Sequence, residues 1–232
     1  MPSTTSTVPE ASTQHVASPL CPALGGRAVQ AAGPPVPIRC RERQLVGGLV
    51  VPWISYEHGG HSAFGTVDAV RAQQALAERL CQVCGEQLEE RFCLAVRPMD
   101  VRVGFAPEPA LHPECLAYSK QRCPMLNGTA TTYRASSMLA RHPAGRPCDD
   151  LNCPCLEAVP DEGHSARSGR PADDFDAWMI DTSHYRIKTA PDRPHVLLGV
   201  DLAVPVLRIR PIRRNPQPEL DRLLALFSAL GL

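Results

Sequence analysis

The sequence has few lysines, few aromatic residues and no long apolar run. Its 232 residues carry 24 Lys and Arg against 24 Asp and Glu, so the formal net charge is zero. Lys120 and Lys188 are the only lysines. A neutral chain has no overall field that would attract nucleic acid or a membrane surface. Without a run of about 20 apolar residues, no membrane span is predicted.

The N-terminal segment also lacks the features of a signal peptide. Residues 1–20 are rich in Ser, Thr and Pro, with no basic start and no apolar segment. We therefore expect a cytoplasmic, reducing environment. In such an environment, clustered cysteines bind metal more often than they form disulfides, so the 10 Cys of this chain first suggest metal sites.

Two ligand pairs are the most specific pattern in the sequence. Cys81-Gln82-Val83-Cys84-Gly85 is followed by His112-Pro113-Glu114-Cys115. Each pair has two residues between its members, and together they supply the four soft donors that a tetrahedral zinc ion takes. Four protein ligands leave no open coordination position. The pattern therefore predicts a structural zinc ion and not a catalytic one.

The elements around these pairs are in the order typical of a treble clef. Asp68 can cap a helix over 69–80, which leads directly into Cys81. Alternating residues predict strands over 91–96 and 101–105, with a turn between them. A short helix over 113–120 would then begin between His112 and Cys115. Its N-terminus favours the negative charge of a Cys115 thiolate.

Two further expectations concern how the ligands are held. Gly85 would allow a tight turn whose backbone N–H groups point at thiolate sulfur. His112 should bind as a neutral imidazole, with its second ring nitrogen held by an acceptor that the sequence does not reveal. The alternative is a redox dithiol formed by Cys81 and Cys84. It is disfavoured because a thioredoxin-like motif begins a helix, whereas this one follows a helix.

A second metal site is suggested by the remaining cysteines. Three of them are packed into eight residues, and another one upstream could complete a four-thiolate set. The candidate ligands are Cys123, Cys148, Cys153 and Cys155. The alternative is that Cys123 is a buried apolar residue and that the other three have no ligand role. Cys93 alternates with strand neighbours and is expected in the core.

Composition divides the chain into three parts of an α+β protein. Residues 1–44 predict a disordered tail in which Cys21 and Cys40 are spare thiols. Residues 45–157 form the small, zinc-organised, treble-clef-like region with β-hairpins and short helices. Residues 158–232 contain a loop, strands and an amphipathic C-terminal helix, expected to pack on the zinc region. The other predicted elements are a hairpin of strand 49–54, turn 58–61 and strand 62–67, a helix over 136–141, strands 178–180, 185–187, 195–198 and 204–209, and the helix 218–230.

The motif order resembles that of a family of uncharacterised proteins from actinobacteria and their phages. The resemblance covers about two thirds of the chain and spares the N-terminal tail. It rests on Val51-Pro52-Trp53, the two ligand pairs, Cys123-Pro124-Met125-Leu126, Trp178-Met179-Ile180 and Arg208-Ile209-Arg210. The resemblance implies a zinc site and a cytoplasmic setting, but no activity and no catalytic residue.

Three classes of function remain open. Enzyme chemistry is disfavoured for two reasons. The ββα-metal nucleases require a catalytic His inside the zinc framework, and no His lies between Cys84 and His112. Zinc deaminases require a His-x-Glu motif, and none precedes Cys81. His58 and His61 could bind a ligand at the hairpin tip, but two exposed turn histidines are the simpler interpretation.

Nucleic acid is the first candidate partner. It would bind through Arg186, Arg208, Arg210, Arg213 and Arg214. A solvated strand face balanced by Asp173, Asp174 and Asp176 is the alternative. A regulatory role, or a protein-interaction adaptor that uses the C-terminal helix, is the remaining class.

Overall fold

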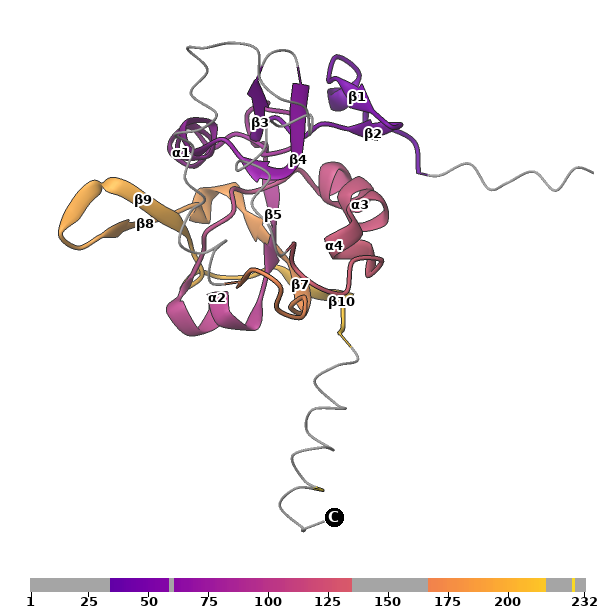
Figure 1. The fold of residues 1–232 in the computed structure, drawn as a ribbon. Helices are drawn as coiled ribbons and strands as arrows, with labels where there is room; N and C mark the ends of the chain where they lie inside the picture. The colour runs from indigo at the N-terminus through magenta and orange to yellow at the C-terminus, as the bar shows by residue number, and fades with distance from the viewer. Residues whose placement is uncertain (1–33, 59–60, 135–166, 216–226, 228–232) are drawn as a thin grey trace, which may run out of the picture. The chain divides into compact units, whose positions relative to one another are not determined.

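The computed structural model describes residues 34–58, 61–134, 167–215 and 227 (Figure 1). The predicted tail up to residue 33, the helix 136–141, the cysteines Cys148, Cys153 and Cys155, and the C-terminal helix other than Phe227 lie outside these ranges. The described part combines short helices with small antiparallel sheets, so it is α+β as predicted. It contains no helix long and apolar enough to cross a membrane.

A three-stranded antiparallel sheet contributes core residues next to the first ligand pair. It contains β5 (Arg91–Val96), β7 (Phe175–Asp181) and β10 (Arg208–Arg213) in the order β10-β7-β5. After Arg91 every residue of β5 is buried, as expected of a strand that is covered on both faces. The other edge of β5 pairs with a single residue, Leu111. Cys93 of β5 and Leu111 form two backbone hydrogen bonds, of 2.8 and 2.9 Å. This pairing fixes the position of the chain just before His112.

The second sheet lies against helix α1. It contains β6 (Phe105–Ala106), β8 (Ile187–Ala190) and β9 (Arg193–Asp201) in the order β6-β9-β8. Gln73 of α1 exchanges two hydrogen bonds with the backbone of Leu197 in β9. The predicted strands 178–180 and 195–198 lie inside β7 and β9. β8 and β10 both begin later than predicted. The segment before β8 is taken up by a 3-10 turn, Thr182–His184, which Asp181 caps.

The N-terminal part contains a hairpin, but the predicted first strand over 49–54 is wrong beyond Val50. β3 (Ser55–His58) pairs with β4 (His61–Val67), whereas Leu45–Val46 and Leu49–Val50 form a separate pair, β1 and β2. The segment that we placed at the end of the tail also carries structure. Ile38–Cys40 forms a 3-10 turn, η1, and Cys40 is buried instead of being a spare thiol.

The helices agree with the sequence at the ligand pairs and differ between them. α1 (Ala69–Glu78) begins at the predicted cap, since Asp68 accepts hydrogen bonds from the N–H groups of Val70 and Arg71. α3 (Pro113–Arg122) begins between His112 and Cys115, and α4 (Pro124–Asn127) follows it (Figure 1). The predicted strand over 101–105 is wrong in its first three residues, which lie in helix α2 (Pro98–Val103).

Candidate metal centre

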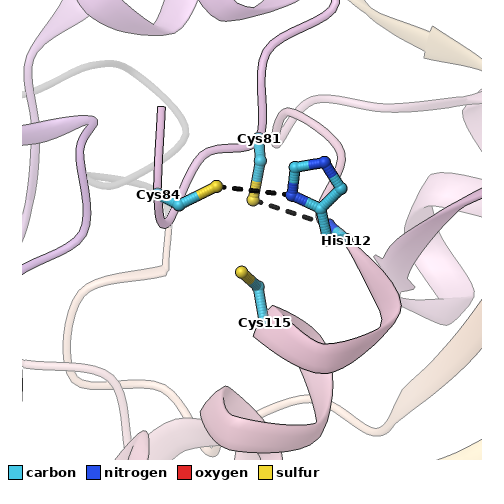
Figure 2. Close-up of side chains that lie close together, drawn as sticks. All are labelled: Cys81, Cys84, His112 and Cys115. Carbon is cyan, nitrogen blue, oxygen red and sulfur yellow. Dashed lines mark hydrogen bonds between the residues drawn. The ribbon is translucent and has the colours of Figure 1, made fainter. Parts of the chain in front are cut away.

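Four buried side chains converge at the start of α3. Figure 2 shows Cys81 and Cys84 on the loop after α1, and His112 and Cys115 at the beginning of the helix. The four possible ligand atoms all lie within 4.8 Å of one another, and all four residues are buried. A tetrahedral zinc ion, with bonds of about 2.3 Å to sulfur and about 2.0 Å to nitrogen, separates its ligand atoms by roughly 3.5 to 3.8 Å. The cluster could therefore hold such an ion with small adjustments.

The hydrogen bonds of His112 determine which ring nitrogen faces the cluster. Nδ1 lies 3.3 Å from Cys84 Sγ, and Nε2 lies 3.0 Å from the backbone oxygen of Gln87. A carbonyl oxygen only accepts, so Nε2 carries a hydrogen and Nδ1 is the nitrogen available to a metal. The acceptor that the sequence could not identify is thus the Gln87 carbonyl. Such a partner fixes both the tautomer and the ring orientation of a histidine ligand.

The loop that carries the first ligand pair is held from two sides. On one side, Trp53 and Ile54 donate backbone hydrogen bonds to the oxygens of Val83 and Gln82. On the other side, Gln82 donates to Ala110 and Pro109, just before His112. These hydrogen bonds therefore place the two ligand pairs next to each other.

Gly85 closes this loop in the way that the sequence predicts. Its φ is +83°, in the left-handed region, and its N–H donates to the Cys81 oxygen at 2.8 Å. A Cβ here would lie 2.6 Å from the Trp53 ring, so glycine is required for space as well as for conformation. Backbone N–H groups do point at sulfur: Cys81 Sγ accepts from the N–H of Cys84, and from that of His112 at 3.5 Å.

Hydrogen bonds within the cluster shift the pKa values of its members in opposite directions. Hydrogen bonds from the Cys115 and Cys84 thiols place the pKa of Cys81 far below its usual range, and the pKa of Cys115 is raised correspondingly. Burial alone would lower the pKa of His112, but hydrogen bonds with Cys81 and Cys84 raise it to about 10. The raised pKa of His112 and the lowered pKa of Cys81 favour a proton on the imidazole and a negative charge on the sulfur when no ion is bound. A cation that takes both groups must displace the proton on Nδ1.

Sequence reasoning missed the segment that packs beside the cluster. The thiol of Cys40 in η1 is 1% exposed and belongs to the same buried core as Cys81, Cys84 and Cys115. The preceding Arg39 pairs with three carboxylates, those of Glu86, Glu89 and Glu114. A weak signal was present, because Ile38 to Arg43 introduces charge and an apolar residue directly after the Ala- and Pro-rich stretch.

The remaining cysteines fall into two groups. Cys93 is buried in β5 and belongs to the core, as predicted. Cys123 lies between α3 and α4, outside the four-residue cluster, and burial raises the pKa of its thiol. Its predicted partners Cys148, Cys153 and Cys155 are outside the described residues, so the second site remains a prediction.

The five arginines predicted to contact nucleic acid have different environments. Arg213 is buried and donates to the oxygens of Met125 and Ala130, each at 2.7 Å. Arg214 pairs with Asp176 at 2.6 Å, and Arg186 donates to the backbone of Ser183 and Tyr185. Arg208 and Arg210 are exposed on β10. Of the five, Arg213 is therefore buried, whereas Arg186 and Arg214 are exposed but already bonded within the chain; nucleic-acid binding stays a prediction.

His58 and His61 are opposite each other in the β3–β4 register. A ligand role for this pair stays a prediction. Among the side chains that the structure describes, the Cys81 cluster is the only group found that could hold a metal. Comparisons of this chain with protein-family models, with curated proteins and with solved structures found no match.

Proposed function

We propose that this chain is a zinc-binding protein in which the ion has a structural role. The observation that carries the proposal is the convergence of Cys81, Cys84, His112 and Cys115, all buried and with their ligand atoms within 4.8 Å of one another. Three thiolates and one imidazole are a typical donor set of structural zinc sites. Four protein ligands would fill the coordination shell, so the ion would have no position for a substrate.

The arrangement around the cluster supports a treble-clef-like module. A Cys-x-x-Cys turn is followed by β5, and the chain later pairs antiparallel with β5 at Leu111. The residue after Leu111 is His112, the first member of the second ligand pair, at the start of α3. The zinc ion would join the turn, the strand pair and the helix. The class of role that fits is regulatory or interaction-based rather than enzymatic, since the chemistry supported by the cluster is ion binding.

Metal stoichiometry tests the proposal. Protein purified without added metal should show zinc by native mass spectrometry and by elemental analysis. Cys84→Ser should lose one ion and melt at a lower temperature, because a structural zinc contributes on the order of 10 kcal/mol. Cys93→Ser, which changes a buried thiol outside the cluster, should keep that ion. A wild-type protein without zinc, or a Cys84→Ser variant with unchanged metal content, would contradict the proposal.

The same measurement addresses the second predicted site. Two zinc ions per chain would assign one to Cys123, Cys148, Cys153 and Cys155. In that case a Cys148→Ser/Cys153→Ser variant should lose the second ion and keep the first. One ion in the wild type would leave only the site at the start of α3.

A further inference from the structure

β10 is an edge strand whose outer side is open along part of its length. In the sheet order β10-β7-β5, β10 pairs with β7 on one side, and no other strand of the described residues pairs with it. Residues 207–211 are all exposed. Leu207 and Ile209 are 56% and 53% exposed. An edge of this kind presents unpaired backbone N–H and C=O groups to which another extended chain can add.

Pro211 indicates which backbone groups of β10 face outward. It lies opposite Asp176 of β7, and an edge strand accepts proline where the missing N–H would face away from the neighbouring strand. The Pro211 oxygen accepts a hydrogen bond from Lys120 Nζ at 3.2 Å. Because the same orientation recurs at every second residue, the N–H and C=O of Ile209 also face outward. Lys120 occupies the edge at Pro211, so the open part is centred on Ile209.

The side chains around Ile209 determine which kind of chain fits this edge. Arg208 and Arg210 lie on one face of β10, and Ile209 lies on the other face, opposite Trp178 of β7. Both arginines are exposed, and no carboxylate of the described residues pairs with either. Directly opposite residues in a sheet point to the same face. An added strand would therefore place acidic side chains against the arginines and apolar ones beside Ile209.

We propose that the edge of β10 at residues 207–210 binds an extended segment of a partner protein in which acidic and apolar residues alternate. The backbone of that segment would pair with Ile209, and its carboxylates would pair with Arg208 and Arg210. The inference rests on the interaction-based role proposed above. It involves none of the four candidate metal ligands, since β10 carries none of them.

Two other occupants fit the edge less well. In an antiparallel pairing with a second copy centred on Ile209, Arg208 of each copy would face Arg210 of the other. Like charges directly opposite each other destabilise a sheet. Single-stranded RNA would use the two guanidinium groups but not the exposed apolar side chains, and two basic groups supply few phosphate contacts.

Fluorescence anisotropy with the whole chain and labelled peptides tests the proposal. The probe is a peptide that alternates Glu and Val, and the control peptide has Lys in place of each Glu. The wild type should bind the Glu peptide and not the Lys peptide. Arg208→Glu/Arg210→Glu should weaken binding of the Glu peptide by at least about tenfold and should bind the Lys peptide instead. Arg102→Glu/Arg193→Glu, which reverses two exposed arginines outside β10, should behave as wild type.

The backbone pairing is tested separately, on the wild-type protein. Two further forms of the Glu peptide are N-methylated, one at the Glu residues and the other at the Val residues, so both keep all side chains. One form should lose binding and the other should keep it, because only alternate N–H groups of an added strand face β10. Equal affinity of the two forms would overturn strand addition.

The remaining outcomes distinguish this inference from its alternatives and from the proposed function. Failure of the wild type to bind the Glu peptide, or binding that Arg208→Glu/Arg210→Glu leaves unchanged, would overturn the inference. So would tighter binding of an oligouridine RNA that the same variant loses, or a dimer in sedimentation velocity that the variant dissociates. Zinc content is measured on the same sample. Wild-type protein that binds the Glu peptide but contains no zinc would support the inference and contradict the proposed zinc binding alone.

Discussion

At the scale of single residues, the turn after Cys84 depends on two properties of Gly85. The residue has a φ of +83°, and its face toward the Trp53 ring has no room for a methyl group. Gly104 has almost the same φ, +82°, but nothing lies within 4 Å of the position that a Cβ would occupy there. An alanine at Gly104 would therefore meet only backbone strain, whereas an alanine at Gly85 would meet the same strain and a steric clash with Trp53.

We expect Gly85→Ala to destabilise the protein much more than Gly104→Ala. Gly104→Ala should cost about 1 kcal/mol, the strain of a left-handed backbone without glycine. Gly85→Ala adds a contact that requires Trp53 or the ligand loop to move, and should also weaken zinc binding. Urea unfolding and a zinc competition titration measure the two effects. Equal losses of stability in both variants would show that the Trp53 contact is unimportant.

Residue types and spacing were enough to predict which four side chains meet, but not their surroundings. The Cys-x-x-Cys-Gly and His-x-x-Cys patterns are local in sequence, and their members meet in the structure. Cys40 and the Gln87 carbonyl carry no such local pattern. Cys40 comes from 41 positions before Cys81, as their numbering shows, and the Gln87 contact uses a backbone oxygen that every residue possesses. Tertiary packing alone brings them to the site.

At the scale of secondary structure, the misassigned segment after β5 shows how helix signals compete with a strand pattern. Val101-Arg102-Val103 alternates as a strand would, and both valines are about half exposed. The helix α2 has the stronger signals: Pro98 in the first turn, Asp100 at the third helical position and Gly104 just after the end. A three-residue alternation is too short to outweigh these end signals.

The two capped helices lead to a prediction about the cost of losing a cap. Asp68 caps α1 at the surface, and Asp100 caps α2 from a buried position, where it also forms a pair with Arg97 at 2.8 Å. Asp68→Ala should cost about 1 kcal/mol. Asp100→Ala should cost about 3 to 5 kcal/mol, because the buried Arg97 guanidinium loses the carboxylate that accepts its hydrogen bonds. Thermal and urea unfolding of both variants measure the difference.

Two matched variants make the comparison specific. Asp68→Asn should stay close to wild type, since Asn caps helices equally well. Asp100→Asn keeps the size of the side chain but loses its charge, and should still be clearly destabilised. If Asp100→Ala were as mild as Asp68→Ala, the buried pair would contribute nothing beyond an ordinary cap.

At the scale of the described molecule, the metal cluster is part of the main core. Cys81, Cys84 and Cys115 belong to the same group of packed buried residues as Phe92, Leu94 and Ile180. The sheet and the cluster are also joined through the Cys93–Leu111 pairing. If the cluster binds zinc as proposed, removing the ion should affect the sheet as well as the ligand loop. A contribution on the order of 10 kcal/mol is comparable to the whole stability of a small domain.

We accordingly expect a strong chelator to unfold the described part of the molecule cooperatively. Amide hydrogen exchange should accelerate in β7, which contributes no ligand, together with α3, which carries Cys115. Zinc added back should restore protection in both. Loss of protection in the ligand loop and α3 alone, with β7 unchanged, would show that the ion stabilises only its immediate surroundings.

The pH dependence of zinc affinity follows from the acid–base state of the metal-free cluster. The pKa of His112 is raised to about 10 by its sulfur partners, so its Nδ1 proton competes with zinc throughout the neutral range. Affinity should fall as the pH is lowered, and it should keep rising from pH 7 toward pH 9. With an unperturbed histidine, of pKa about 6.5, only thiol protons such as that of Cys115 would still compete above neutrality, and the affinity would rise less steeply. Chelator competition at several pH values measures the slope, and calorimetry in two buffers counts the protons released. An affinity that is constant above pH 7 would contradict both the raised pKa and the ligation of His112 through Nδ1.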